Sequence, residues 1–287
     1  MKLGILVEVE EGLDWEAWHA TYTTAERLGF ESIWLSDHLE SPWGTRHGLE
    51  TWTALAVAAA ETSRVVLGSL VSPVKFREPA IVARMATTLH DLTHGRFVVG
   101  LGLGWNADEH AAAGIRFPPA AERARRLTAT IERIRCEARV PVLVGGSGSR
   151  TLQVAARSAD QWNMTTASPE AFGVANDQLD RLCLEAGRPP GAIERSIACG
   201  VLTGWNAADL QARAERMRTC IPPLAATHDV QSSAREMGWL VGTTEEVVAH
   251  LRKFAAQGVE RAMLGHYDPR DAGMLEVLAR DVLPRLA

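Results

Sequence analysis

The stretch KLGILVEVEEGLDWEAWHATYTTAERLGFESIWLSDH, residues 2–38, decides the fold because it holds one complete strand–helix–strand unit. KLGILVEV at its start is a short apolar run, typical of a buried strand. The apolar positions that follow recur every three or four residues, as on one face of a helix: Trp15, Trp18, Tyr22, Ala25 and Leu28. Gly29 is expected to end this helix, and SIWLSDH to form a second strand parallel to the first.

The same alternation of short strands and longer helical segments continues along the chain. The expected strands cover residues 2–9, 32–38, 64–71, 96–104, 140–146, 161–166, 195–204 and 261–267. A terminal helix is expected from Met274 to Leu286. Residues that suit helix N-termini stand at four places: Asp14, Ser149, Ser168 and Thr243. Eight such units predict an α/β fold, a closed (β/α)8 TIM barrel, since a doubly wound open sheet rarely needs eight regular repeats.

The bulk composition fits one barrel domain over residues 1–287, with 46% hydrophobic and 23% charged residues. The net charge of −5 disfavours binding to nucleic acid or to anionic membranes. The start MKLGILVEVEEG lacks the ends of a signal peptide, and no stretch has the length and apolarity of a membrane span, so a cytoplasmic protein is expected. The cysteines are widely spaced, and we expect buried, reduced thiols: Cys136, Cys183, Cys199 and Cys220.

One segment departs from the regular alternation. Residues 205–242 contain Pro222-Pro223 and the polar stretch THDVQSSARE. We expect an irregular, mobile loop that lies over the carboxyl ends of the strands.

The carboxyl ends of the strands are where such barrels place their active sites. The second strand ends in Asp37 and His38, with Trp43 close behind. Histidine exchanges protons near neutral pH and a neighbouring carboxylate adjusts its pKa, so the pair suits proton transfer beside a heterocyclic ligand. The alternative is local, with Asp37 capping the loop and His38 bonding to nearby groups.

The third and fourth strands end in small residues. Gly68 and Ser69 allow a flat ring to approach the backbone, although an ordinary strand end would look the same. Every second residue of 100–104 is glycine, which leaves backbone amides free for a ligand, and Asn106 adds a donor and an acceptor. The alternative is close packing of the backbone at the neck of the barrel.

The residues after the fourth strand include Asp108, Glu109 and His110. They lack the spacing of a zinc site, so no metal is predicted. We expect them to form a solvated helix start.

The fifth strand is followed by a glycine-rich turn before an amphipathic segment. Its residues are Gly145, Gly146, Ser147, Gly148, Ser149 and Arg150. Free amides at a helix N-terminus with an arginine nearby attract phosphate, although the turn matches neither the Walker loop nor the G-x-G-x-x-G pattern. A plain turn is the alternative. Together the four strand ends predict a pocket for a phosphorylated cofactor, with three tryptophans as candidate walls: Trp43, Trp105 and Trp162.

Four stretches of this sequence resemble the luciferase-like monooxygenase family, and within it the F420-dependent oxidoreductases. They are SIWLSDHL, LGSLVSPVKFREPAIVARMATTLHDLTHGRFVVGLGLGWNADE, VPVLVGGSGSRTLQVAARSADQWN and VGTTEEVVAHLRKFAAQGVERAMLG. The resemblance covers nearly the whole chain, and the central stretch matches in both order and spacing.

The resemblance implies roles for individual residues. Asp37 and His38 match the pair that faces the deazaflavin ring, with His38 as the proton donor or acceptor. The Ser69–Leu70 bond matches a cis peptide that supports the ring. The cofactor contacts implied after the fourth strand are Gly102, Gly104, Asn106 and Asp108, and the implied phosphate cradle is Gly145 to Gly148. Family members are commonly dimers, so a homodimer is expected.

Two departures from the family pattern limit what the resemblance implies. Trp105 stands where sugar-phosphate dehydrogenases of the family have a catalytic glutamate, so their chemistry is not expected here. Most relatives also carry a longer segment before the fifth strand, whereas this chain runs from Ile134 through RCEAR almost directly into VPVLVGG. That segment normally helps to cover the pocket.

The leading hypothesis is hydride transfer between F420 and a small organic substrate, with Trp43 and Trp105 in the substrate pocket. An FMN-dependent monooxygenase is the alternative enzyme, but it needs a closed, dry pocket, which the shortened segment disfavours. A third hypothesis is a barrel that binds a flavin-like ligand or a partner subunit without turnover.

Overall fold

The computed structural model describes residues 1–43, 48–166 and 168–286, and its centre is a closed barrel of eight parallel strands. In chain order these are β1 (Lys2–Val7), β2 (Ser32–Leu35), β3 (Val66–Ser69), β5 (Phe97–Gly102), β6 (Val142–Gly145), β7 (Gln161–Thr165), β8 (Glu194–Gly204) and β10 (Arg261–Gly265). The barrel closes because β10 pairs with β1 on one side and with β8 on the other. The predicted TIM barrel is therefore confirmed, with all eight strands near the expected positions.

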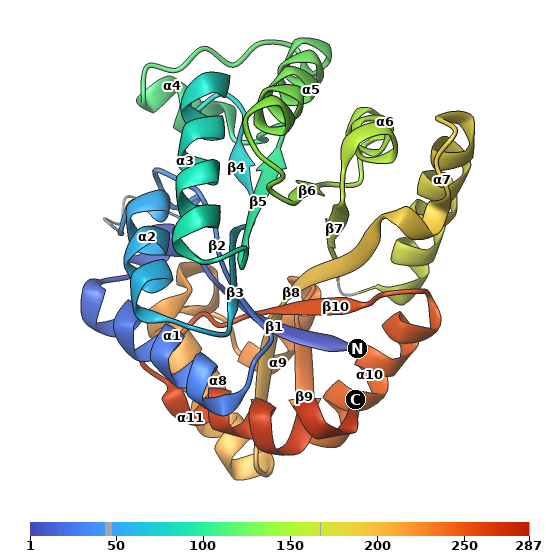
Figure 1. Ribbon diagram of the computed structural model, residues 1–287. Helices are drawn as coiled ribbons and strands as arrows, with labels where there is room; N and C mark the ends of the chain where they lie inside the picture. The colour runs from blue at the N-terminus through green and yellow to red at the C-terminus, as the bar shows by residue number, and fades with distance from the viewer. Residues whose placement is uncertain (44–47, 167, 287) are drawn as a thin grey trace.

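Helices surround the barrel and connect successive strands (Figure 1). They are α1 (Trp15–Leu28), α2 (Thr51–Glu61), α3 (Pro79–Leu92), α5 (Ala120–Glu137), α6 (Ser149–Ser158), α7 (Pro169–Glu185) and α10 (Thr244–Ala256). The terminal helix begins as α11 (Ala272–Val277) and continues as π and 3-10 turns to Arg285. Each helix covers its strand with an apolar face, so most of the core lies between the barrel and the helix layer.

Local capping explains where several helices begin and end. Asp14, Ser168 and Thr243 each accept a backbone N–H of the first helical turn, as their sequence positions predict. Gly29 ends α1 in the left-handed region, with φ of +86°. The expected cap at Ser149 is wrong, because Gly148 occupies that position and provides no side chain.

Residues 205–242 are not the irregular loop that their composition predicts. They form α8 (Ala207–Cys220), a 3-10 turn, α9 (Val230–Glu236) and the start of β9 (Leu240–Thr243), which pairs with the far end of β8. The helices enclose an apolar cluster of their own, which includes Leu210, Met217, Leu224 and Trp239. The periodicity was hard to recognise because proline and polar residues interrupt it, but the segment still buries enough apolar surface to fold.

The segment before β6 is as short as the sequence indicates, since α5 ends at Glu137 and β6 begins at Val142. The cysteines are only partly as expected. Cys183 and Cys199 are buried, whereas Cys136 is exposed on the outer side of α5 and Cys220 is half-buried. Within the described residues, no helix has the length and apolarity needed to cross a membrane.

Candidate functional site

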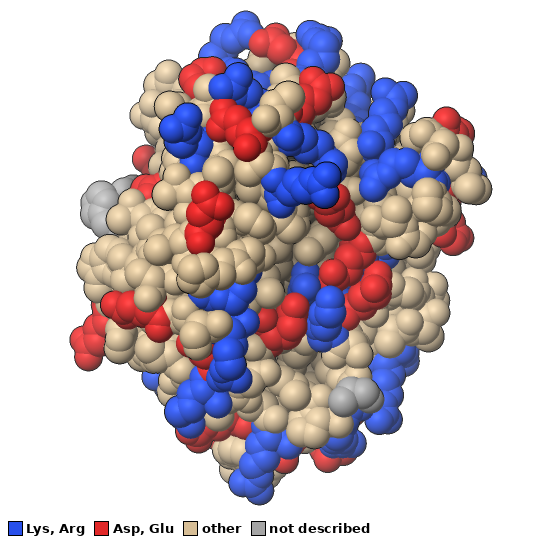
Figure 2. All heavy atoms as spheres, viewed as in Figure 1, with Lys and Arg blue, Asp and Glu red and all other residues tan. Residues whose placement is uncertain are grey.

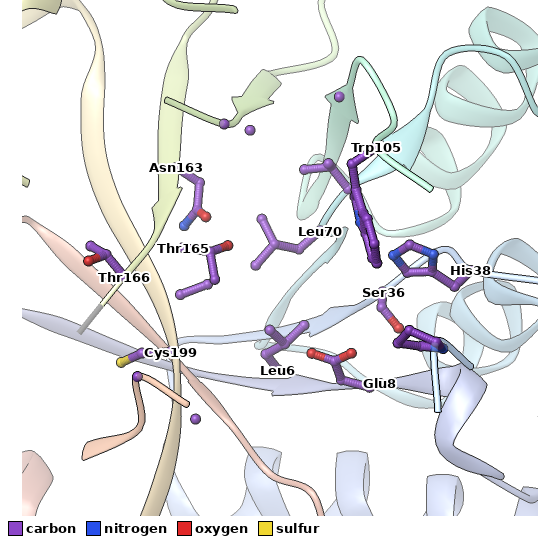
Figure 3. A pocket seen from close by; sticks show the side chains of 18 of the residues that line it. Leu6, Glu8, Ser36, His38, Leu70, Trp105, Asn163, Thr165, Thr166 and Cys199 are labelled. Atoms are coloured by element: carbon purple, nitrogen blue, oxygen red, sulfur yellow. The ribbon is translucent and has the colours of Figure 1, made fainter. Parts of the chain in front are cut away.

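The main pocket of the protein lies at the carboxyl ends of the barrel strands and has a volume of about 980 Å³. Residues from β1, β5, β6, β7 and β8 line it, together with Ser36 and His38 just beyond β2 and the segment around Trp239 (Figure 3). The predicted position over the strand ends is therefore where the cavity is found. Residues 205–242 do reach over this end of the barrel, but as helices with their own core.

The His38 imidazole lines the pocket and is held from behind by Glu109. The Glu109 carboxylate lies 3.0 and 3.1 Å from His38 Nδ1 and also accepts the backbone N–H of Leu39 at 2.5 Å. Trp105 packs edge-on against the imidazole, with ring centroids 5.7 Å apart. Figure 3 shows His38 and Trp105 side by side at one wall of the cavity. Because Nδ1 is occupied, Nε2 is the nitrogen left to exchange a proton with a ligand.

Glu109 and His110 correct the expectation of a solvated helix start. Both are buried, and they belong to the short helix α4 (Ala107–Ala112). Burial opposes protonation of His38, but the hydrogen bond and charge of Glu109 outweigh it, so the pKa of His38 is raised. The same contact overcomes burial at Glu109 and lowers the pKa of its carboxyl group. The pair therefore favours a protonated imidazole beside a carboxylate.

Two further carboxyl groups, Glu8 and Glu10, enter the pocket from the end of β1. Burial and the neighbouring Glu10 raise the pKa of Glu8 well above its usual range, and burial also raises the pKa of Glu10. Tyr267 donates to Glu8 at 3.2 Å, and its ring stacks on Trp239 at 4.3 Å. Figure 3 shows the Glu8 carboxyl group pointing into the cavity. This side of the pocket thus combines acidic and aromatic groups.

Asp37 lies outside the pocket lining, which corrects its expected place beside the ligand. Arg77 donates two hydrogen bonds to its carboxylate, at 2.6 and 3.2 Å, and Trp52 Nε1 donates a third at 3.2 Å. Asp37 is also buried. A carboxylate engaged in this way anchors the strand end rather than a ligand, as the local alternative for Asp37 predicts.

The strand-end glycines make room for Val71, which was not among the expected site residues. A Cβ at Gly102 would lie 2.5 Å from the Val71 side chain, and one at Gly145 would lie 2.7 Å from it. The cis peptide joins Leu70 to Val71, so the expected Ser69–Leu70 bond is one residue too early. Leu70 and Val71 line the pocket, whereas Ser69 is buried and bonds to the backbone of Gly100.

The glycine-rich turn after β6 contributes only part of the expected phosphate cradle. Gly145, Gly146 and Gly148 line the pocket together with Thr151, and the N-terminus of α6 has no side-chain cap. Ser147 and Arg150 are exposed and lie outside the pocket lining. Instead, Arg123 from α5 lines the pocket and adds the positive charge that the sequence suggested for Arg150.

The remaining predicted site residues divide between the pocket wall and the scaffold. Trp43 and Trp105 line the pocket and expose 46% and 65% of their surface, so a ligand can cover them. Trp162 is buried against Phe172 and belongs to the core. Gly104 is in the pocket lining, whereas Asn106 caps α4 by accepting the N–H of Glu109 at 3.1 Å. Asp108 is exposed and lies outside the lining.

Sequence reasoning missed Glu8, Glu10, Glu109 and Arg123. Applying the strand-end rule to the first strand would have found Glu8 and Glu10 within VEVEE. Glu109 and Arg123 lie on helices after the fourth strand, where spacing alone does not show which side chain turns inward. Within the described residues, no group of three or more His, Cys, Asp or Glu side chains is arranged to hold a metal ion.

Known proteins share this architecture. A protein of Intrasporangium calvum named F420-dependent glucose-6-phosphate dehydrogenase is 28% identical over 315 residues, which span 91% of this chain and 92% of the relative. One of the same name from Microbacterium testaceum is 32% identical over 177 residues, and this match spans 52% of each protein.

The solved structures share the fold. An F420-dependent secondary alcohol dehydrogenase in complex with an F420-acetone adduct has a TM-score of 0.81 at 19% identity, covering 100% of this chain and 99% of that one. A riboflavin lyase with modified FMN has a TM-score of 0.80 at 13% identity, covering 100% and 91%. The sequence model of the luciferase-like monooxygenases matches residues 1–261. This chain therefore belongs to the luciferase-like monooxygenase family.

Proposed function

We propose that this protein is an oxidoreductase that transfers a hydride between the deazaflavin F420 and a small organic substrate. The observation that carries the proposal is the pairing of His38 with Glu109 at one wall of a large pocket whose other wall holds the open N-terminus of α6. A proton-handling group and an anion-binding group within one cavity suit a phosphorylated redox cofactor. The F420-dependent relatives support the choice of cofactor.

The residues present fit such a cofactor. A flat ring has apolar surface at Leu70 and Val71, and the glycines around Val71 allow this segment to stand close to β5 and β6. The amides at the N-terminus of α6 and the Arg123 side chain would hold the phosphate, whereas the Gly146 amide already donates to the Asn163 carbonyl at 2.9 Å. When bound, F420 supplies a ring carbon that accepts or releases a hydride.

His38 performs the proton chemistry in this proposal. Glu109 fixes the orientation of the imidazole through Nδ1 and raises its pKa, which favours the protonated imidazole with a proton on Nε2. Trp105 covers the edge of the imidazole and limits its motion. Reduction of a carbonyl or imine group needs this proton at the substrate heteroatom, and the reverse reaction returns it to His38.

The charge of the pocket favours an uncharged substrate. The acidic lining residues are Glu8, Glu10 and Glu236, and the cationic groups among the described lining residues are His38 and Arg123. With Arg123 reserved for the cofactor, no arginine or lysine of the described lining remains for a substrate phosphate. The exposed rings of Trp43 and Trp105 add apolar contact area. We therefore propose a flat, uncharged substrate rather than a sugar phosphate.

Turnover with reduced F420 tests the proposal. A panel of enones, imines and quinones is incubated with enzyme and reduced F420, and the return of the absorbance band of oxidised F420 is followed. We expect turnover of at least one neutral class and none in the reverse assay with glucose 6-phosphate and oxidised F420. Oxygen-dependent turnover with reduced FMN alone would assign the protein to the monooxygenases, and cofactor binding without any turnover would make it a binding protein.

A further inference from the structure

We propose that Glu8 selects the substrate, because its carboxyl group accepts a hydrogen bond from a hydroxyl or N–H group of a flat, neutral compound. The inference rests on the proposed function and names the substrate group that this side of the pocket recognises. Glu8 follows β1 directly and lines the cavity, and Figure 3 shows its carboxyl group pointing into the open space. The side chain is half-buried, so a ligand in the cavity can reach it.

Two stacked aromatic rings hold the Glu8 carboxyl group in this position. The Tyr267 hydroxyl donates to Glu8 Oε1 at 3.2 Å, and the Tyr267 ring lies parallel to Trp239, with centroids 4.3 Å apart and an interplanar angle of 6°. Trp239 packs on the end of β8, where a Cβ at Gly200 would lie 2.5 Å from its ring. Tyr267 packs on the end of β10, where a Cβ at Gly265 would lie 2.9 Å from its ring. This packing restricts Tyr267, so the acceptor is in place before a ligand binds.

Glu8 is also in contact with a second carboxyl group, that of Glu10. The two carboxyl groups are hydrogen-bonded to each other, and Ser36 donates a further hydrogen bond to Glu10. Burial and the neighbouring Glu10 raise the pKa of Glu8, and together they outweigh the lowering of this pKa by His38. Two interacting carboxyl groups titrate as a pair and hold one proton between them over a wide pH range. The pair therefore carries a single negative charge.

The pair lacks the cationic partners that carboxylates on the outside of the protein have. Figure 2 shows lysines and arginines interspersed with aspartates and glutamates over the surface. Among the residues that the structure describes, neither Glu8 nor Glu10 forms an ion pair with a lysine or an arginine. A hydrogen-bond donor from a ligand would therefore compensate part of the remaining charge. Because the shared proton already cancels one of the two charges, a neutral donor is sufficient.

The hydrogen-bonding capacity that Glu8 has left is that of an acceptor. A carboxyl group has about four lone-pair sites, and Tyr267 uses one of them. Since the proton of the pair lies between Glu8 and Glu10, the other lone pairs of Glu8 are available to a donor in the cavity. A substrate hydroxyl or N–H group matches them, whereas the charge of the pair repels a carboxylate or a phosphate. The adjoining rings of Trp239 and Tyr267 suit a flat carbon skeleton.

Four naphthalene probes test this role, because they share a flat skeleton and differ in a single group. Naphthol has a hydroxyl donor, methoxynaphthalene has no donor, naphthoate is an anion and naphthylmethylammonium is a cation. Their affinities are measured by calorimetric titration at neutral pH, with and without oxidised F420, for the wild type, Glu8→Leu, Tyr267→Phe and Glu40→Leu. Glu40→Leu is the matched control, since it removes an exposed carboxylate that lies outside the pocket lining.

The ratio of the affinities for the two neutral probes reports the hydrogen bond to Glu8. We expect the wild type to bind naphthol about 5- to 20-fold more tightly than methoxynaphthalene, and naphthoate more weakly than either. Glu8→Leu should reduce this ratio to less than about threefold, because no acceptor remains. Tyr267→Phe should reduce it less, since the carboxyl group stays but loses the hydroxyl that holds it. Glu40→Leu should leave the ratio unchanged.

An unchanged ratio in Glu8→Leu would overturn the inference, as would tightest binding of naphthylmethylammonium or failure of the wild type to bind any probe. F420 affinity is measured in the same variants and should change by less than about threefold. An equal loss of F420 and naphthol affinity in Glu8→Leu would assign Glu8 to the cofactor and also overturn the inference. A wild type that binds F420 without preferring naphthol rejects the inference alone. A preference for naphthol without any binding of F420 rejects the proposed function and leaves the hydroxyl-binding role of Glu8.

Discussion

His38 and Glu109 are separated by 71 positions in the chain, yet their side chains are in contact at the wall of the pocket. The contact makes the protonation of His38 depend on Glu109, since the carboxylate raises the pKa of the imidazole against the effect of burial. The fraction of protonated His38 is high below this pKa and falls as the pH rises through it. Substrate reduction should follow the same curve.

Removing the carboxylate tests this dependence. Glu109→Gln keeps the shape of the side chain but loses the charge, so we expect the alkaline limb of turnover to move to lower pH. The pH profile of kcat/KM is the measurement. A profile that keeps its position would show that His38 is not the titrating group.

His38→Ala separates proton transfer from cofactor binding. We expect turnover to fall by about 100-fold or more, a typical contribution of a general acid, while F420 affinity changes much less. The two are measured by steady-state kinetics and by titration. If both fell by the same factor, His38 would be a structural residue.

The close packing of Val71 against neighbouring glycines predicts that a larger residue at Gly102 destabilises the protein. Gly102→Ala places a methyl group 2.5 Å from Val71, so we expect it to lower the free energy of unfolding by about 1–3 kcal/mol. Gly191→Ala is the matched control, because no atom lies within 4 Å of its new Cβ, and it should change stability by less than about 0.5 kcal/mol. Adding Val71→Ala to Gly102→Ala should restore part of the loss. Denaturant titration gives these values, and an unaffected Gly102→Ala protein would contradict the close approach.

Individual residues show which parts of the site could be predicted from the sequence alone. Asp37 was expected at the ligand because it adjoins His38, but both residues lie beyond the end of β2. The Asp37 carboxylate turns to Arg77, whereas His38 lines the pocket. Arg150 was expected at the phosphate because it follows the glycines, whereas the arginine in the pocket comes from α5. Sequence reasoning located strand ends that line the pocket, but side-chain direction across different elements depends on packing that spacing does not encode.

At the scale of elements, the segment from α8 to β9 is the largest difference from the sequence-based expectation. Its apolar side chains close over Leu224, which is fully buried, and Trp239 connects the segment to Tyr267 at the pocket. Ion pairs between Arg213 and Asp271 and between Arg216 and Asp271 join α8 to the start of α11. The regular strand–helix units were predictable because each shows its own periodicity of apolar residues and its own capping residues. The segment from α8 to β9 instead depends on contacts between short helices and a short strand.

Leu224→Ala tests whether the segment is a packed unit. Truncating a fully buried leucine should cost about 2–4 kcal/mol of unfolding free energy and make residues 205–243 sensitive to limited proteolysis. Leu184→Ala on α7 is the control, since 66% of that side chain is exposed and its loss should cost less than about 0.5 kcal/mol. Rapid cleavage of the wild type within this segment would favour the mobile loop that the sequence suggested.

At the scale of the whole molecule, the barrel brings residues from β1, β6 and α5 and from the segment after β2 to one end, which no single element could do. The pocket lining as a result combines Arg123 and the N-terminal turn of α6 with His38 and the acidic residues Glu8 and Glu10. The fold alone does not determine the reaction, since structures with F420 and with FMN share it at similar TM-scores. The identity of the cofactor therefore decides between the proposed function and its alternatives.

A side-by-side equilibrium titration of the purified protein with F420 and FMN tests the central claim most directly. We expect F420 to bind more tightly, with one site per chain, and to protect the exposed Trp43 and Trp105 from quenching by a soluble quencher. Tighter binding of FMN, or binding of neither compound, would contradict the assignment of this pocket to F420.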